Sequence, residues 1–165
     1  MKTVNLINRM ASLTMVLALT TAVFTGCSKN KEEGPVGSTD KGMVKMTVTT
    51  SGEFDKNKGA DINVTVSSHD SRANYQKWKV NGVETGAEMN HTYLSDAFNG
   101  GKTLILESPE TYLGASVNVS AATSDIGYTL KYKLEEKGKV VEEATVLVSK
   151  DKPVRKNWVF SNYGK

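Results

Sequence analysis

Residue types that hydrolases use for nucleophilic catalysis occur side by side at His69-Asp70-Ser71. A catalytic triad needs three side chains that converge in space, and adjacency along the backbone does not supply that geometry. The second histidine, His91, is distant in the sequence, and neither histidine belongs to a metal-protease or hydrolase motif. We therefore predict no catalytic residues and no enzymatic activity, and we interpret both histidines as loop or strand-end residues.

Oxygen-bearing side chains alternate with lysines in the segment 55–61, which reads Asp-Lys-Asn-Lys-Gly-Ala-Asp. Oxygen ligands at alternate positions are typical of calcium-binding loops. An EF-hand loop that begins at Asp55 would need a glycine at residue 60 and a glutamate at residue 66, where the chain has Ala60 and Val66. The lysines would also lie beside the ion. We therefore predict a polar loop here, and we expect neither a metal ion nor another cofactor.

Aromatic side chains gather near the C-terminus, at Trp158, Phe160 and Tyr163. If exposed, such rings could stack on the apolar C–H faces of sugars, which makes Trp158 and Tyr163 candidates for ligand stacking. Large aromatic residues at alternate positions of a strand normally face inward, however. We therefore favour Trp158 and Phe160 as residues that close a hydrophobic core.

Cys27 is the single cysteine of the chain and follows a segment with a pattern of its own. Lys2 and Arg9 precede the uncharged run Met10–Phe24, an arrangement typical of a secretory signal peptide. The run is shorter than the roughly 20 residues that cross a hydrocarbon core, which makes a permanent membrane span the weaker alternative. The other alternative is a buried free thiol, and the position of Cys27 directly after the apolar run argues against it.

The residues Phe24-Thr25-Gly26-Cys27 resemble the lipobox of bacterial lipoproteins, with Phe24 where that family usually has leucine. The resemblance implies that residues 1–26 are a cleaved signal peptide. It also implies that Cys27 becomes the first residue of the mature chain and carries fatty acyl chains, palmitate among them. More than one acyl chain gives stable anchoring, whereas a single chain is marginal.

The charged triplet Lys31-Glu32-Glu33 resembles the surface-export signal of Bacteroidota lipoproteins. This resemblance implies a lipid-anchored protein on the outer face of the outer membrane. The alternative is a solvated tether whose charges only prevent it from folding. Residues 27–42 show no apolar periodicity, and we predict a flexible tether that holds the domain at most roughly 50 Å from the membrane.

Charge and cysteine content limit the classes of function. Loss of residues 1–26 removes Lys2 and Arg9, so the formal net charge falls from +3 to +1, with 19 basic against 18 acidic residues. A nearly neutral domain has no general electrostatic reason to bind nucleic acid. Without a second cysteine no internal disulfide can form, and the remaining length suits one domain stabilised by its core.

Apolar and polar residues alternate with period two along most of the mature chain, and no window shows sustained helical periodicity. The dipeptide Asn81-Gly82 between Val80 and Val83 is the strongest hairpin signal, because a type I′ turn needs positive φ at both central residues. Expected strands cover residues 43–48, 62–66, 76–80, 91–94, 103–107, 117–121, 128–134, 140–148 and 158–160, with a further short strand after residue 83.

These short strands predict an all-β antiparallel sandwich over residues 43–162. The pattern Tyr75-x-x-Trp78-x-Val80-Asn81-Gly82, with Tyr128-Thr129-Leu130 and a hairpin at Gly138, resembles the immunoglobulin-like and PKD-like domains of bacterial surface proteins. The resemblance implies about seven to nine strands and makes Trp78 the buried tryptophan of the third strand.

The predicted surface location and the predicted β-sandwich together favour a non-catalytic binding or accessory module at the cell surface, with a glycan or a protein as ligand. The alternative is a structural subunit that docks on an outer-membrane transport or secretion complex through exposed strand edges. An exposed aromatic platform would favour glycan binding, and a contiguous exposed apolar patch would favour docking.

Overall fold

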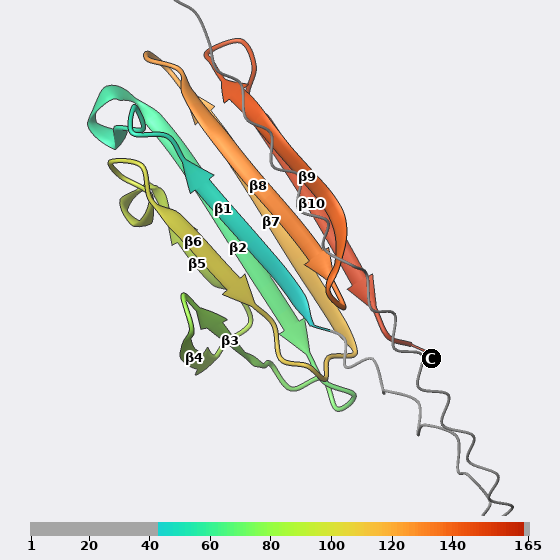
Figure 1. Ribbon diagram of the computed structural model, residues 1–165. Coiled ribbons are helices and arrows are strands. Elements are labelled where there is room, and N and C mark those ends of the chain that lie inside the picture. Colours follow the sequence, from blue (N-terminus) through green and yellow to red (C-terminus); the bar gives the residue numbers. More distant parts are fainter. Residues whose placement is uncertain (1–42, 164–165) are drawn as a thin grey trace, which may run out of the picture. The chain divides into compact units, whose positions relative to one another are not determined.

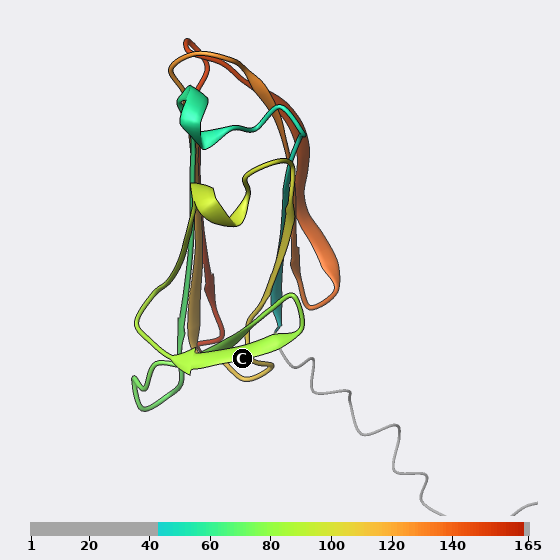
Figure 2. The same cartoon turned by 90° about the vertical axis from the view of Figure 1, so that its left-hand side faces the viewer.

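A computed structural model describes residues 43–163 of the chain as two packed antiparallel β-sheets (Figures 1 and 2). The predicted all-β sandwich is therefore confirmed. The signal peptide, Cys27, the triplet Lys31-Glu32-Glu33 and the tether lie outside the described residues. The predictions made for them remain predictions.

The larger sheet contains six strands in the order β4-β3-β6-β1-β8-β9. Its centre is formed by β1, which pairs antiparallel with both β6 and β8. In chain order the strands are β1 (Val44–Thr50), β3 (Lys77–Val80), β4 (Val83–Ala87), β6 (Thr103–Glu107), β8 (Tyr128–Glu136) and β9 (Lys139–Val148).

The smaller sheet contains four strands in the order β10-β7-β2-β5. Its two long central strands, β2 (Ala60–His69) and β7 (Gly114–Thr123), pair along their whole length. The edges are β5 (His91–Leu94) and β10 (Val154–Ser161). Two single-turn 3₁₀ helices, η1 (Lys56–Lys58) and η2 (Ser95–Ala97), interrupt the loops at one end.

Residues 43–163 contain ten strands, more than the seven to nine that the immunoglobulin-like resemblance implies, and the short strands expected after residue 83 and at 91–94 are present as β4 and β5. The predicted hairpin at Asn81-Gly82 is confirmed, with φ of 48° and 82° at the two residues and Val80 paired with Val83. The Asn81 side chain also accepts a hydrogen bond from the backbone N–H of Ile105 in β6, at 2.9 Å. The turn is thereby fixed to the neighbouring strand.

The core lies between the sheets and follows the predicted alternation. In β1 and β2 every second residue is buried, and Met46 and Val64 are completely so. Trp78 is also fully buried, and its indole N–H donates to the hydroxyl of Ser68 in the opposite sheet at 3.1 Å. A buried indole needs such a partner, because an unpaired buried donor is costly. Trp78 thus joins the two layers.

Candidate functional site

The segment after β2 carries the chain from the smaller sheet to the larger one. Tyr75 still bridges to His69, and the N–H of Gln76 still donates to Ser68 O at 3.2 Å. From the next residue, Lys77, the chain is part of β3, which pairs with β6 only at Lys79 and Val80. Figure 2 shows this segment and the green β3–β4 hairpin spanning the space between the layers at one end of the sandwich. The separation of β3 from β6 leaves a hollow between them.

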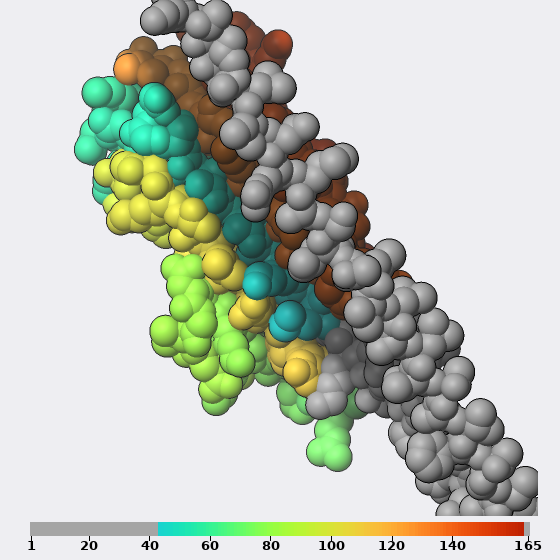
Figure 3. Space-filling model, in the orientation of Figure 1, coloured from blue at the N-terminus to red at the C-terminus, as the bar shows by residue number. Residues whose placement is uncertain are grey.

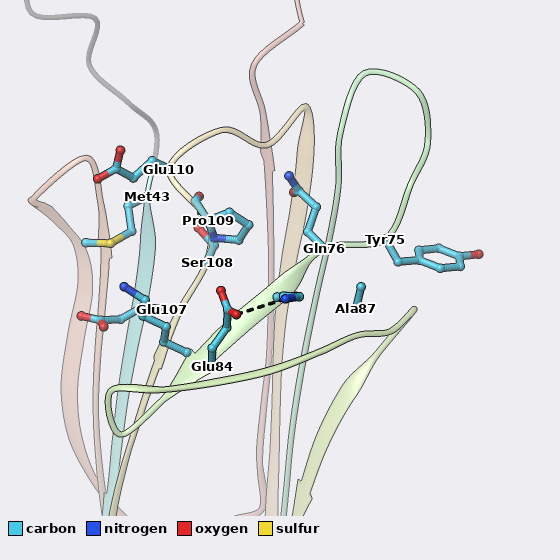
Figure 4. Close-up of a pocket in the computed structure, with 11 residues that line it drawn as sticks. Met43, Tyr75, Gln76, Glu84, Ala87, Glu107, Ser108, Pro109 and Glu110 are labelled. Atoms are coloured by element: carbon cyan, nitrogen blue, oxygen red, sulfur yellow. Dashed lines mark hydrogen bonds and ion pairs between the residues drawn. The ribbon is translucent and has the colours of Figure 1, made fainter.

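This hollow, which we call the charged hollow, has a volume of about 500 Å³ and is lined by charged residues of both signs together with apolar residues (Figure 4). Lys77 donates to the Glu84 carboxylate at 3.1 Å, across the hairpin. Figure 4 shows the ring of Tyr75 pointing away from the other lining residues. The remaining members are Lys79, Glu107 and Glu110, with Met43, Ala87 and Pro109 among the apolar contributors.

A second, smaller hollow of about 230 Å³ lies at the end of the smaller sheet, and we call it the Tyr163 pocket. The side chains of Tyr163 and Val159 are 64% and 74% exposed beside it. The other lining residues are mostly small or hydroxyl-bearing, together with one phenylalanine and one histidine: Ser67, His69, Gly114, Ala115, Ser116, Phe160 and Ser161. The pocket therefore combines an open aromatic ring with hydroxyl groups and an imidazole.

Backbone hydrogen bonds hold the C-terminal segment in position beside this pocket. The N–H of Asn162 donates to Leu113 O at 2.9 Å, and its side-chain amide donates to Tyr112 O at 3.0 Å. Leu113 in turn donates its N–H to His69 O at 2.8 Å. These bonds join the ends of β2 and β10 to the link between β6 and β7, so Tyr163 extends from a fixed attachment point.

His69 forms one wall of the Tyr163 pocket because residue 114 is glycine. A Cβ on Gly114 would lie 2.5 Å from Nε2 of the imidazole, so any other residue would displace the ring. The neighbouring Asp70 carboxylate is directed at its own loop, where it accepts from the backbone N–H groups of Arg72 and Asn74. The carboxylate also accepts from the side-chain amide of Asn74 at 3.0 Å. This bond, together with the two backbone bonds, lowers the pKa of Asp70. His69 ends β2, and His91 begins β5.

Two buried amide oxygens belong to side chains that contact the loop between β6 and β7. Oε1 of Gln76 and Oδ1 of Asn162 have no hydrogen-bond partner within residues 43–163. Their amide nitrogens donate to consecutive carbonyls, those of Thr111 at 2.6 Å and Tyr112 at 3.0 Å. Buried acceptors of this kind generally take a donor from water or a ligand. This end of the sandwich therefore holds unused hydrogen-bonding capacity.

The outer face of the smaller sheet is nearly free of charge, and we call it the neutral face. A row of short polar residues crosses all four strands: Asn157, Asn118, Thr65 and Thr92. The hydroxyls of Thr65 and Thr92 lie 3.1 Å apart, and those of Ser67 and Ser116 lie 2.8 Å apart. The Ser67–Ser116 pair and Val159 also line the Tyr163 pocket, so the face and the pocket are continuous.

The outer face of the larger sheet has the opposite character. One row of alternating charge crosses five strands, in the order Glu135, Lys45, Glu107, Lys79 and Glu84. Lys45 and Glu107 form an ion pair of 3.0 Å, and Lys133 pairs with Glu135 at 2.9 Å. Figure 3 looks onto this side of the molecule, where teal β1 and yellow β6 lie next to each other and the green β3–β4 hairpin projects beyond them.

The two candidate stacking residues have different surroundings. Tyr163 is exposed, whereas Trp158 is half-buried and packs against the core, as does buried Phe160. The indole N–H of Trp158 donates to Oε2 of Glu142 at 2.9 Å, and its ring lies 5.7 Å from that of Tyr132. The predicted core position of Trp158 and Phe160 matches this arrangement, and of the three C-terminal aromatic residues only Tyr163 has an exposed ring.

Glu142 links the edge strands of the two sheets. Besides the Trp158 indole, its carboxylate accepts from Tyr132 Oη at 2.7 Å and from Lys156 Nζ at 2.8 Å. These three donors, led by Lys156, lower the pKa of Glu142 to about 2. Burial, followed by the Glu142 carboxylate, raises the pKa of Tyr132. The cluster is therefore a charged, fully hydrogen-bonded junction between β9 and β10.

The segment 55–61, which has alternating oxygens, is a loop only in part: Asp55 caps the 3₁₀ helix η1, and Ala60 and Asp61 already belong to β2. Asp55 accepts a hydrogen bond from the N–H of Asn57 at 2.9 Å and lies 3.6 Å from Lys58 Nζ. Lys56 pairs with Asp96 of η2, and the Asp61 carboxylate accepts from the Ser95 hydroxyl at 2.8 Å. Both carboxylates of the segment therefore have partners within the protein. Over the described part of the chain, no group of three His, Cys, Asp or Glu side chains is arranged to hold a metal ion.

Sequence reasoning did not identify the charged hollow or the neutral face. Both depend on which residues become neighbours across several strands, and that register is set by pairings far apart in the chain. The sequence does contain a partial signal for the neutral face. Between Asp61 and His69 the outward positions of β2 are Asn63, Thr65 and Ser67, and the outward positions of β7 begin with Ser116, Asn118 and Ser120, all of them uncharged.

Comparison with solved structures finds the same fold in proteins of Bacteroides and Parabacteroides. A DUF4425 family protein of Bacteroides ovatus has a TM-score of 0.50 at 14% identity, covering 75% of this chain and 98% of that one. A DUF4425 domain of unknown function from Bacteroides vulgatus has a TM-score of 0.50 at 14% identity, covering 73% and 94%. A Parabacteroides distasonis protein, solved in a calcium-bound form, has a TM-score of 0.51 at 12% identity, covering 81% and 100%.

At these identities the likeness concerns the fold alone. No protein-family model and no curated protein matches the chain. Within residues 43–163, no helix has the length and apolar character needed to span a membrane.

Proposed function

We propose that this protein is a non-catalytic glycan-binding lipoprotein, anchored in the outer membrane through Cys27 and displayed on the cell surface. The lipobox-like residues support the lipid anchor, and the triplet Lys31-Glu32-Glu33 supports display on the cell surface. Neighbours of the same fold come from Bacteroides and Parabacteroides, which belong to the phylum whose export signal the triplet resembles. The immunoglobulin-like character of the sandwich also remains a proposal, supported by the fully buried Trp78.

The exposed ring of Tyr163 at the edge of a neutral pocket is the observation that supports glycan binding. An aromatic face offers the apolar surface on which the C–H groups of a sugar ring can stack. The hydroxyls of Ser67, Ser116 and Ser161 lie where hydrogen bonds to sugar hydroxyls can form. Ligand pockets generally combine such an apolar surface with a few convergent polar groups. The pocket contains both parts.

The test is binding of neutral oligosaccharides to the purified lipoprotein in detergent, by array and then by calorimetry. Tyr163→Ala should weaken binding by about tenfold or more, because it removes the stacking surface. Tyr75→Ala is the matched control, since Tyr75 is a tyrosine with 48% exposure at the same end that points away from the charged hollow. Equal losses in both variants, or no binding by the wild type, would contradict glycan binding at Tyr163.

Location is tested separately, by protease treatment of intact cells and immunoblotting. We expect the wild type to be cleaved from the surface and a variant with Lys31, Glu32 and Glu33 replaced by alanine to be protected. Cys27→Ser should change the mature size and release the protein from the membrane fraction. Protection of the wild type would indicate that the protein faces the periplasm.

The charged hollow favours the second candidate, a subunit that docks on an outer-membrane complex. Its rim includes Met43, where the described chain enters β1, so the hollow lies at the end next to the predicted tether. Mixed charges suit a protein surface of complementary charge, which steers association and fixes register. Cross-linking in cells followed by co-purification should recover a defined envelope partner from the wild type but not from Lys79→Glu.

A further inference from the structure

The Tyr163 pocket is open toward the neutral face. Ser67 of β2, Ser116 of β7 and Val159 of β10 belong to both. From these residues the three strands run side by side away from the pocket. A ligand that fills the pocket can therefore continue along the strands without leaving the protein surface.

The side chains along this path can either donate hydrogen bonds to hydroxyl groups or accept hydrogen bonds from them. Hydroxyls and carboxamides both donate and accept hydrogen bonds. Asn118 and Asn157 are exposed at the middle of the face, on neighbouring strands about 4.8 Å apart. Successive outward residues such as Ser116, Asn118 and Ser120 follow one another at about 6.7 Å along β7. The face thus offers a ladder of polar contacts several sugar units long.

Charge distinguishes this face from the rest of the surface. Between the Tyr163 pocket and Asp61, the outward positions of β2, β7 and β10 include one charged residue, Arg155. Covering charged side chains requires their desolvation, which is costly unless the ligand pairs with them. Short neutral side chains also have little rotamer entropy to lose when they are covered. The face is therefore suited to an uncharged ligand and offers little to a polyanion.

We infer, building on the proposed function, that the protein binds an extended, uncharged glycan chain. One sugar unit stacks on Tyr163, and the following units lie along β7 and β2 over Ser116, Asn118 and Thr65. The ligand class is a neutral polysaccharide, whereas a single free sugar would use only the pocket.

The experiment measures affinity of the full lipoprotein in detergent for length ladders of glucan and mannan, from monosaccharide to hexasaccharide, with polyuronates of equal length for comparison. We expect affinity to rise by at least about tenfold between monosaccharide and tetrasaccharide, as contacts accumulate. Polyuronates should bind more weakly. Tyr163→Ala should weaken binding at every length.

Asn118→Asp tests the path itself, because it places a charge in the middle of the neutral face without changing side-chain size. It should weaken binding of the tetrasaccharide and leave the monosaccharide unaffected. Thr145→Asp is the matched control, since Thr145 is exposed on the outer face of the larger sheet. Thermal unfolding of both variants checks that the fold is intact.

The outcomes separate the two proposals. Affinity that is independent of length, or equal effects of Asn118→Asp and Thr145→Asp, would overturn the extended path while leaving the pocket in place. Tighter binding of the polyuronates would overturn the choice of an uncharged ligand. If the wild type binds no saccharide, the proposed function and this inference are both overturned. The same holds if co-purification recovers a protein partner and no saccharide binds.

Discussion

The two lateral sides of the sandwich are closed by opposite chemistry. On the side of β3 and β5, fully buried Trp78 fills the space between the sheets, and one neutral hydrogen bond to Ser68 satisfies its N–H. On the side of β9 and β10, half-buried Glu142 accepts from three donors, one of them cationic Lys156. Figure 1 shows these strand pairs at opposite edges.

The two sides differ because the backbone excludes water from the space between the sheets on one side only. The chain itself crosses from one sheet to the other beside Trp78, so the backbone excludes water there and a large apolar side chain can be buried. The β9–β10 side has two edge strands whose inner faces remain close to solvent. A charge at such a position keeps part of its hydration, and its hydrogen bonds still tie the strands together. Stability on the two sides should therefore depend on different conditions.

The largest effect is expected for Trp78→Ala. Loss of this side chain should lower the free energy of unfolding by about 3–5 kcal/mol, because it leaves a cavity and an unpaired Ser68 hydroxyl. Urea denaturation of the purified protein measures the change. Trp158→Ala is the comparison on the other side and should cost less, since its ring is only half-buried. An equal or larger loss for Trp158→Ala would show that the β9–β10 side carries more of the stability.

A smaller, pH-dependent effect is expected for Glu142→Gln. Near neutral pH this change should cost about 2 kcal/mol, because a carboxylate accepts stronger hydrogen bonds than a neutral amide. The folded state lowers the pKa of Glu142 from 4.5 to about 2, so its contribution is complete above about 4.5 and is lost as pH falls toward about 2. The gap between variant and wild type should close over that window.

Glu143→Gln is the control for this measurement, since Glu143 is exposed on the same strand and faces outward. Its effect should stay within about 0.5 kcal/mol at every pH. A pH-independent gap for Glu142→Gln would mean that the cluster acts through packing and not through its charge.

The smallest effect is expected for Lys45→Gln on the outer face of the larger sheet. Lys45 and Glu107 form a 3.0 Å ion pair with side chains that are 34% and 22% exposed. Such pairs contribute about 0–1 kcal/mol, and salt screens them. Thermal unfolding in low and high salt should show a difference from wild type that disappears in high salt. A loss as large as that of Glu142→Gln would show that a single ion pair on the sheet face contributes as much stability as the three-donor cluster around Glu142.

Strand positions and inward-facing residues could be predicted from the sequence, whereas the composition of the sheets' outer faces could not. Alternation placed Val44, Met46 and Val48 inside, and Asn81-Gly82 located a turn, because these properties depend on neighbours along the chain. The row from Asn157 to Thr92 depends on three separate strand pairings. No local pattern contains that information, which is why the neutral face was not predicted.

Glu142 shows why its cluster was also missed. It is in phase with Ala144, Val146 and Val148, so alternation alone would direct it inward. A register shift lies between Leu134 and Glu135 of the partner strand β8, so that Leu134 is opposite Glu142 but Glu135 is opposite Val140. The shift interrupts the alternation at residue 141. An acidic residue next to this break resembles a surface position until the opposite strand, with Lys156 and Trp158, is known.

The inward charge and the register shift of β9 have a consequence for many copies of the protein at once. An unprotected strand edge is a template on which another molecule can add its own strand, and a long edge invites fibres. An inward-pointing carboxylate and a local irregularity are two devices that make such growth unfavourable. Where copies are crowded together, β9 should therefore keep neighbouring domains separate, and their outer faces remain accessible.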